Sequence, residues 1–406
     1  MKVLHTADWH LGKRLEQFPR IKEQAEVLEE ICSIADEEDV DLVLIAGDLF
    51  DTYNPPTEAE ELFYRTLKKL SKNGQRPVIA IAGNHDSADR INAPNPLAHQ
   101  NGIILVGYPN EIVRPFTLDT GVRITKSEPG FIELVLPKYD YPLRLLMTPY
   151  ANEYRLKTYL GKQNAEENMR GLLAQQWREL ADLHCDSSGI NILVSHLFFM
   201  KEGSAIKSEP EDEKPILHVG GAQPILTRDI PKQLQYVALG HLHRYQIVDD
   251  EPCPCIYSSS ILEYSFSEAH QTKYVVCAEL EPSEQVKVKK IEISTGKKLV
   301  RKKFDDIDLC LNWLRENLDC YVELTIQTEK YLTGEERRRI LRTHENVVTI
   351  IPEMMGNNQH DTNPQQLDLD QSMEDLFIQY FQHRQGQSPA KSILELFGEL
   401  KAIDES

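Results

Sequence analysis

The sequence predicts a mixed α/β (α+β) protein whose main strands are buried inside sheets. Three observations support this class. Short apolar runs alternate with amphipathic helical segments over the first ~110 residues, as in chains that build a sheet covered on both faces. The apolar runs end next to Asp, Gly or Ser-His, which places polar side chains where the strands end. At 406 residues the chain also exceeds a comfortable single core, so we expect two or three units.

The expected elements follow in order along the chain. Buried strands are expected at residues 2–6, 41–46, 78–82, 191–194 and 236–239. Helices with one apolar face are expected at residues 20–38, 57–70 and 164–183. Between residues 112 and 150 the pattern changes to shorter alternating strands separated by Pro and Gly. The polar run 201–214 is expected to form a loop.

Five short motifs follow the five strands and carry the chemistry of this chain. They are Asp8-Trp9-His10, Gly47-Asp48, Gly83-Asn84-His85-Asp86, Ser195-His196 and Gly240-His241-Leu242-His243. Carboxylate, amide and imidazole ligands suit borderline-to-hard divalent cations, so manganese, iron and zinc are all admissible. The lack of paired cysteine ligands argues against a closed structural zinc site. Any one motif occurs by chance in many proteins, whereas five together at strand ends favour a metal site.

Two such cations roughly 3.5–4 Å apart can hold both the attacking and the leaving oxygen of a displacement at phosphorus, and can activate water near neutral pH. The motifs therefore indicate phosphoester hydrolysis. In this order and spacing they resemble the motifs of the calcineurin-like metallophosphoesterases. Within that superfamily, the segments around Asp8, Asp48 and His85 and the later run 257–268 are similar to the SbcD family of bacterial nucleases. The similarity is close to about residue 280 and looser beyond it.

The resemblance implies a four-layer αββα metallophosphoesterase sandwich with a small α+β capping domain and C-terminal helices. It also implies two divalent metal ions, with manganese expected. One ion would be held by Asp8, His10, Asp48 and His243, and the other by Asp48, Asn84, His196 and His241. His85 would be the catalytic general acid or transition-state stabiliser, although it could instead be a structural residue of its loop. Asp86 and Asp51 would support these groups without binding metal, Asp86 by orienting His85 through a hydrogen bond.

The formal net charge of −19 bears on the expected DNA substrate. A protein that bound DNA alone would be expected to carry a basic face, because phosphate contacts dominate nucleic-acid affinity. The one basic run, at residues 287–303, could be a DNA-facing strip or only a solvated charged face. We therefore expect a partner subunit to supply most of the DNA-binding surface.

The domain boundaries expected from sequence and resemblance are a metallophosphoesterase nuclease domain at 1–294, a capping domain at 295–354, a linker at 355–371 and partner-binding helices at 372–406. The last segment has apolar residues at helical spacing. By resemblance it would dock onto the coiled coil of an SbcC-type ATPase, within a heterotetramer that contains a homodimer of this chain. The alternative is that these helices fold back onto the capping domain.

Composition sets the expected compartment. The chain has no apolar stretch of the ~18–20 residues that a membrane span needs, no signal-like segment at its start, and seven scattered cysteines that suit reduced thiols. We expect a cytoplasmic protein without membrane contact. It also lacks the G-x-x-x-x-G-K-[ST] motif, so ATP hydrolysis would belong to the partner.

The activity that the resemblance implies is a double-strand 3′→5′ exonuclease and a single-strand or hairpin endonuclease. Both would be controlled by ATP, in DNA repair, recombination and replication. Two alternatives remain open at this point. The chain could be another phosphoesterase, acting on phosphoproteins or cyclic nucleotides, or a non-catalytic scaffold that only recruits a partner.

Overall fold

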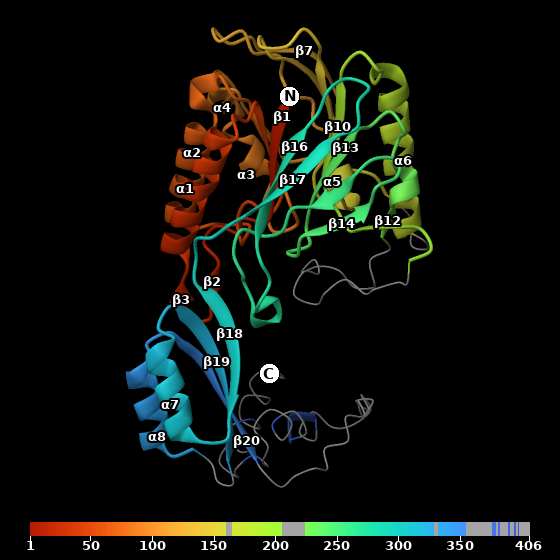
Figure 1. Ribbon diagram of the computed structural model, residues 1–406. Helices are drawn as coiled ribbons and strands as arrows, with labels where there is room; N and C mark the ends of the chain where they lie inside the picture. Colours follow the sequence, from red (N-terminus) through yellow and green to blue (C-terminus); the bar gives the residue numbers. More distant parts are fainter. Residues whose placement is uncertain are drawn as a thin grey trace. The chain divides into compact units, whose positions relative to one another are not determined.

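The computed structural model describes residues 1–159, 165–204, 224–328 and 332–354, together with 376–378, 381, 389, 394 and 397. The chain divides into two compact units, Met1–Met354 and Met355–Ser406. The first unit contains two large sheets, one small three-stranded sheet and the helices that cover them (Figure 1). Within the described residues, no helix is long and apolar enough to cross a membrane.

The first large sheet has six strands in the order β17-β16-β1-β4-β5-β6. Their bounds are β1 (Lys2–Thr6), β4 (Leu42–Ala46), β5 (Val78–Ile81), β6 (Ile103–Val106), β16 (Tyr274–Glu279) and β17 (Lys287–Glu292). The four strands from β1 to β6 in this order are parallel, while β16 pairs with β1 in antiparallel register, Leu4 opposite Cys277. Every residue of β4 and β5 is buried, as the unbroken apolar runs predict.

The second large sheet has seven strands in the order β14-β15-β13-β10-β9-β8-β7. Their bounds are β7 (Arg123–Glu128), β8 (Phe131–Val135), β9 (Leu143–Thr148), β10 (Ile190–His196), β13 (Tyr236–Gly240), β14 (Gln246–Asp249) and β15 (Cys255–Tyr257). Strands β9, β10, β13 and β15 are parallel, so β10 and β13 end at the same edge. Two short pairs complete the strands of this region, β2 (Arg14–Leu15) with β3 (Phe18–Pro19) and β11 (Phe199–Met200) with β12 (Ile225–Leu226).

Four layers result, in the order helix, sheet, sheet, helix, and this confirms the predicted sandwich (Figure 1). Helices α1 (Ile21–Glu37) and α2 (Thr57–Leu70) pack on the outer face of the first sheet, where Leu28 and Phe63 join Val43 in one apolar cluster. Helix α6 (Ala165–His184) covers the second sheet through Leu173 and Trp177. The core between the sheets is largely apolar, with Val3, Leu44, Ile132 and Ile192. It also holds the buried His5, whose ring nitrogens lie 2.9 Å from the Tyr236 hydroxyl and 3.1 Å from Leu239 O of the opposite sheet. The remaining helices are short: α3 (Ala88–Asn92), α4 (Asn95–Ala98), α5 (Glu153–Leu156) and the 3₁₀ helices η1 (Lys72–Gly74), η2 (His99–Asn101), η3 (Thr227–Asp229) and η4 (Phe266–Glu268).

The small sheet has three parallel strands in the order β18-β19-β20 and its own apolar core. Its elements are β18 (Lys298–Phe304), α7 (Ile307–Glu316), β19 (Cys320–Thr328), α8 (Gly334–Thr343) and β20 (Val347–Met354). This α+β pattern is the one expected of a capping domain, whereas the boundaries 1–294 and 295–354 stay predictions. The apolar spacing predicts this helix over residues 309–318. Helix α7 begins two residues earlier, at Ile307, because the Asp306 side chain accepts the Leu309 N–H and caps it there.

Several expectations lie on residues outside the described part of the chain. These are the linker 355–371, most of the polar loop 201–214 and most of the helices 372–406. Among the few described residues of the second unit, the ring of Phe377 stacks on that of Phe397 with centroids 4.2 Å apart. All seven cysteines are buried and unpaired, as expected of reduced thiols.

Candidate metal centre

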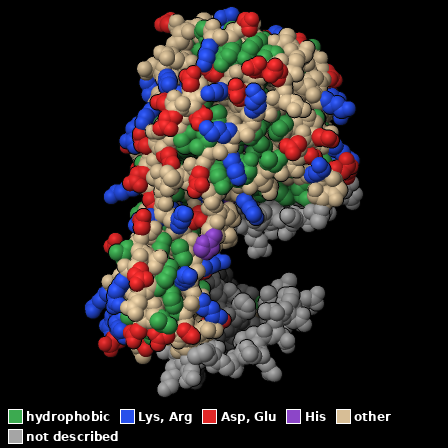
Figure 2. Space-filling view, viewed as in Figure 1, with side chains coloured by type: hydrophobic (Ala, Val, Ile, Leu, Met, Phe, Trp, Pro, Cys, Tyr) green, Lys and Arg blue, Asp and Glu red, His purple; other side chains and the backbone are tan. Residues whose placement is uncertain are grey.

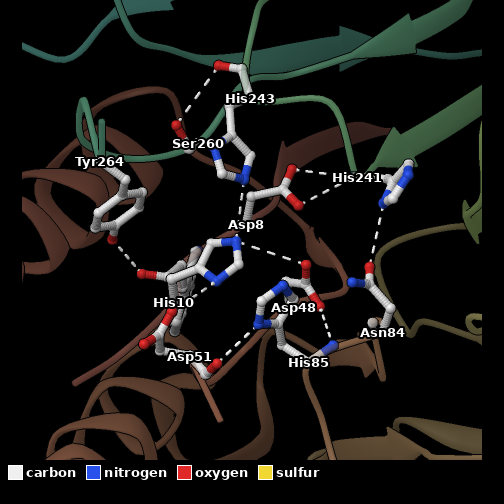
Figure 3. A network of polar contacts seen from close by, with 12 residues as sticks. Asp8, His10, Asp48, Asp51, Asn84, His85, His241, His243, Ser260 and Tyr264 are labelled. Carbon is white, nitrogen blue, oxygen red and sulfur yellow. Dashed lines mark hydrogen bonds and ion pairs between the residues drawn. The ribbon is translucent and has the colours of Figure 1, made fainter. Parts of the chain in front are cut away.

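The five motifs meet at one rim of the sandwich, where strands β1, β4, β5, β10 and β13 end (Figure 3). Backbone hydrogen bonds join the motifs of the first sheet, since the Asp8 N–H donates to Gly47 O at 3.0 Å and the His10 N–H to Asp48 O at 2.9 Å. The two sheets are joined by His196 Nδ1, which lies 2.8 Å from Ala46 O. Parallel strands therefore bring residues almost 240 positions apart to one site.

The first group of candidate ligands contains Asp8, His10 and His243, whose donor atoms all lie within 4.8 Å of one another. The Nε2 atoms of His10 and His243 are 3.0 Å apart, and His10 Nε2 is 3.5 Å from Asp48 Oδ2. Two ring N–H groups cannot point at each other over this distance, so at least one of these nitrogens presents a lone pair. A metal ion would satisfy both nitrogens.

The second group of candidate ligands surrounds Asn84. The amide oxygen of Asn84 lies 3.0 Å from His196 Nε2 and 3.1 Å from His241 Nδ1. Asp48 Oδ2 is 3.3 Å from His196 Nε2, which puts this carboxylate between the two groups. The predicted bridging role of Asp48 is thus compatible with its position, although Asp8 also joins Asp48 and His196 in a group of potential ligands.

The donor set fits a pair of divalent ions. All seven predicted ligands are buried, the most exposed being Asn84 at 8%. Burial raises the pKa of Asp8, a cost to its charged form that bound cations would offset. Burial lowers the pKa of His10 to about 3, which keeps this imidazole neutral, as a metal ligand must be. His10 Nδ1 is buried without a hydrogen bond, and the carboxylate oxygen Asp51 Oδ1 lies 3.6 Å from it. His196 is different, because the charges of Asp48 and Asp8 outweigh burial and raise its pKa to about 9.

Backbone conformation and close contacts explain why the motifs contain glycine. The predicted ligands Asp8, His10 and Asp48 have φ values of 53°, 43° and 47°, a left-handed backbone conformation that residues other than glycine rarely adopt and that clusters at functional sites. A Cβ on Gly47 would lie 2.1 Å from His196 Nδ1, and one on Gly83 would lie 2.1 Å from Asp48 Oδ1. Glycine is therefore required for the ligands to approach the neighbouring strand ends.

His85 lies beside the ligands without joining either histidine pair. Its N–H donates to Asp48 Oδ1 at 2.9 Å, and its ring lies edge-on to that of His10 with centroids 4.8 Å apart. The ring Nδ1 is 2.8 Å from the backbone oxygen of Asp51. His85 is only half-buried, so it can reach a bound substrate.

Asp86 and Asp51 support the site in ways that differ from the expectation. Asp86 accepts the backbone N–H groups of Gly83, Leu49 and Phe50 at 2.8–3.0 Å, so it ties two motif loops together. The His85 ring was expected to form a hydrogen bond with Asp86. Its Nδ1 instead donates to the backbone oxygen of Asp51. The Asp51 carboxylate pairs with Lys13 at 2.8 Å and lies 3.6 Å from His10 Nδ1.

Several supporting residues were not predicted from the sequence. Gln24 on α1 donates to His10 O at 2.8 Å and to the Tyr264 hydroxyl, which itself donates to Trp9 O. Arg155 on α5 donates to the carbonyls of Gly83 and Asp86.

Glu268 was missed as well, and its Oε1 lies 3.1 Å from His243 Nδ1. Its inclusion in the run 257–268, which carries the family resemblance, was the only available signal for this residue. The position of Arg155 relative to the motifs gave no such signal.

Comparison with known proteins agrees with this geometry. A family model described as calcineurin-like phosphoesterase matches residues 1–245. The SbcD subunit of the nuclease SbcCD from Bacillus subtilis (strain 168) is 35% identical over 409 residues, which cover 98% of this chain and 97% of that protein.

Two solved structures are more distant. The TT1561 protein of Thermus thermophilus is 12% identical, covers 71% of this chain and 98% of its own, and has a TM-score of 0.37. A dimetal phosphatase from Danio rerio is 13% identical, with 73% and 99% covered and a TM-score of 0.36. Both TM-scores are too low to bear on the assignment, which follows from the family match, the nearly full-length relative and the grouped ligands. The chain is therefore a hydrolase that depends on divalent metal ions and belongs to the calcineurin-like phosphoesterase family.

Proposed function

We propose that this chain is the nuclease subunit of an SbcCD-type complex and that it cuts DNA phosphodiester bonds with two manganese ions. The activities we propose are a double-strand 3′→5′ exonuclease and a single-strand or hairpin endonuclease, used in DNA repair, recombination and replication in the cytoplasm. The nearly full-length similarity to a protein named as the SbcD subunit of a nuclease supports this assignment. The donor set of carboxylate, amide and imidazole groups is chemically suited to Mn²⁺.

The position of His85 is the observation that carries the proposed chemistry. When bound, the ions would supply an activated water and neutralise charge on the phosphate. The Nδ1–H of His85 donates to Asp51 O, so a doubly protonated ring would carry its second proton on Nε2, the atom that can pass it to the departing ribose oxygen. The bond from the His85 N–H to Asp48 Oδ1 fixes the ring beside the ligands without using the ring as a ligand.

The test replaces His85 by Gln and measures cleavage of three substrates with Mn²⁺: end-labelled linear duplex DNA, a DNA hairpin and a small aryl phosphodiester. We expect the rate on DNA to fall by about 10²–10⁴ while two ions still bind, because a general acid contributes about that much. His184→Gln is the matched control, since His184 lies at the end of the outer helix α6 and pairs with Glu128 of β7. A DNA cleavage rate unchanged in H85Q would refute the catalytic role. Cleavage of the aryl ester alone would favour another phosphoesterase function.

Surface charge supports a shared DNA-binding surface. Several cations of the basic run form ion pairs with acidic neighbours: Lys289 with Glu38, Arg301 with Glu323 and Lys303 with Glu353. Figure 2 shows Lys and Arg intermixed with Asp and Glu over this face. Because such pairing reduces the charge available to phosphates, we propose that a partner ATPase supplies most of the DNA contacts.

The partner would bind residues 372–406, as the apolar spacing of that segment indicates, in a heterotetramer with two copies of this chain. Deletion of 372–406 should abolish association with an SbcC-type ATPase in size-exclusion chromatography. Manganese-dependent cleavage of simple DNA should persist, since the metal centre lies in the first unit. Association that survives the deletion would place the docking site elsewhere.

A further inference from the structure

A buried ion pair lies directly behind one predicted metal ligand. Glu268 and Lys273 are 2% and 4% exposed, and Glu268 Oε2 is 2.5 Å from Lys273 Nζ. Lys273 also donates to Ser260 Oγ at 2.9 Å. Burying a charged pair carries a desolvation cost, so a pair without a second role is weak evidence of stabilisation. What the pair contacts therefore decides its role.

Both members of the pair hold His243. Glu268 Oε1 lies 3.1 Å from His243 Nδ1, and Lys273 Nζ donates to the His243 backbone oxygen at 2.9 Å. A carboxylate facing Nδ1 requires the proton on that atom, which leaves a lone pair on Nε2. That Nε2 faces His10 and the Asp8 carboxylate (Figure 3). The pair thus fixes both the tautomer of His243 and the direction of the Nε2 lone pair.

At His196, the group in hydrogen-bond contact with Nδ1 is a neutral carbonyl, Ala46 O at 2.8 Å. The nearest carboxylate oxygen to this nitrogen, Asp8 Oδ1, is farther away at 3.9 Å. In the first group, His10 Nδ1 also has a carboxylate nearby, with Asp51 Oδ1 at 3.6 Å. A carboxylate behind an imidazole makes the ring a stronger base and a better ligand than a carbonyl does. His243 and His196 are therefore electronically unequal as potential ligands.

We propose that Glu268 and Lys273 are positioning residues that orient His243 and make the Asp8–His10–His243 metal site the tighter of the two. The inference rests on the metal centre of the proposed function. Loss of the carboxylate should then weaken one site selectively, whereas a merely structural role would weaken both sites or neither.

The test is calorimetric titration of the metal-free, full-length chain with MnCl₂. We expect two binding events in the wild-type protein. In Glu268→Gln the tighter event should weaken by about 10–100-fold while the other keeps its affinity, since the amide keeps the shape and loses the charge. Glu263→Gln is the matched control, because Glu263 is another buried carboxylate of the same segment, 6% exposed, and accepts the Leu299 N–H instead of facing His243. Its titration should match the wild type.

A double-mutant cycle separates positioning from folding. In a His243→Ala background, Glu268→Gln should cause no further loss of affinity, because the residue through which it acts is gone. If E268Q alone does not fold, E268Q/K273M removes both charges together and should show the same selective weakening.

Wild-type affinities at both sites of E268Q or of E268Q/K273M, or an equal loss with and without His243, would overturn the inference. A wild-type chain that does not bind two manganese ions would instead overturn the proposed metal centre. Activity is not needed for any of these readouts.

Discussion

Arg155 offers a sharp test of how the Gly83–Asp86 motif is held. Its side chain is 2% exposed and donates to the backbone oxygens at the two ends of the motif, Gly83 O at 2.8 Å and Asp86 O at 2.6 Å. Between these carbonyls lie the predicted ligand Asn84 and His85. Arg155→Met keeps the apolar stem of the side chain and removes both hydrogen bonds.

The expected cost follows from those two contacts. A hydrogen bond with a charged partner contributes about 1.5–3 kcal/mol, so we expect the free energy of unfolding to fall by roughly 3–5 kcal/mol. The released motif should also lower the manganese affinity of the site that contains Asn84 by about 10–100-fold, as loss of support behind a ligand does. Cleavage of DNA should decrease with it, because His85 shares the loop.

Arg76→Met separates the two effects. Arg76 is also 2% exposed and donates to the backbone oxygens of Val40, Ala35 and Leu70, at the opposite end of β5 from Gly83. Urea unfolding should detect a comparable loss of stability in both variants, whereas manganese titration should detect weaker binding in R155M only. Wild-type manganese affinity at both sites of a destabilised R155M would refute the reasoning.

Three further predictions concern stability and the ions. Asp41→Asn should lower the free energy of unfolding by about 1–2 kcal/mol at pH 7, because the carboxylate accepts hydrogen bonds from Lys2 N and Tyr139 Oη. The ion pair of Asp41 with the half-exposed Lys138 adds little to this free energy. Burial would raise the Asp41 pKa, but these donors lower it, so the difference from wild type should be constant above about pH 5 and shrink as the pH falls below about 4 in urea titrations. Adding Mn²⁺ at 100 times its dissociation constant to the chelated chain should add about 2.7 kcal/mol per site, visible as a higher melting temperature, and no rise would contradict a folded-state metal centre. Gly83→Ala should abolish metal binding in calorimetry, since its Cβ would meet Asp48 Oδ1 at 2.1 Å, whereas Gly171→Ala on α6, with nothing within 4 Å, should be neutral or stabilising.

The buried strands were predicted from a local physical signal, whereas the four-layer sandwich was predicted from the family resemblance. Residues 41–46 and 78–82 are unbroken apolar runs, and both form strands buried on two faces. The insertion of β16 beside β1 was not predictable, because its register depends on pairing between residues about 270 positions apart. The start of helix α7 was misplaced by two residues because the prediction followed the apolar spacing and did not use the local cap of Asp306.

The residues of the site also differ in how well the sequence predicts them. Ligand chemistry predicts Asp8, Asn84 and His196 as metal ligands, because metals select donor types and strand ends bring such residues together. The groups behind the ligands carry no such signature. Glu268 is one of 64 acidic residues, and Arg155 one of 45 basic residues, and only folding shows which of them contact a motif.

The supporting contacts also show what the protein itself contributes to the geometry of the site. Gln24 holds His10 O, Lys273 holds His243 O, and Asp8 Oδ1 accepts the His241 N–H at 2.9 Å, so the protein alone restrains each of these backbone segments. Left-handed residues such as Asp8 cost about 1–3 kcal/mol each and persist only where the surroundings impose them. Buried hydrogen bonds therefore offset part of this strain and restrain the backbone that carries the predicted ligands. A change behind a predicted ligand should accordingly alter metal affinity with little effect on the fold.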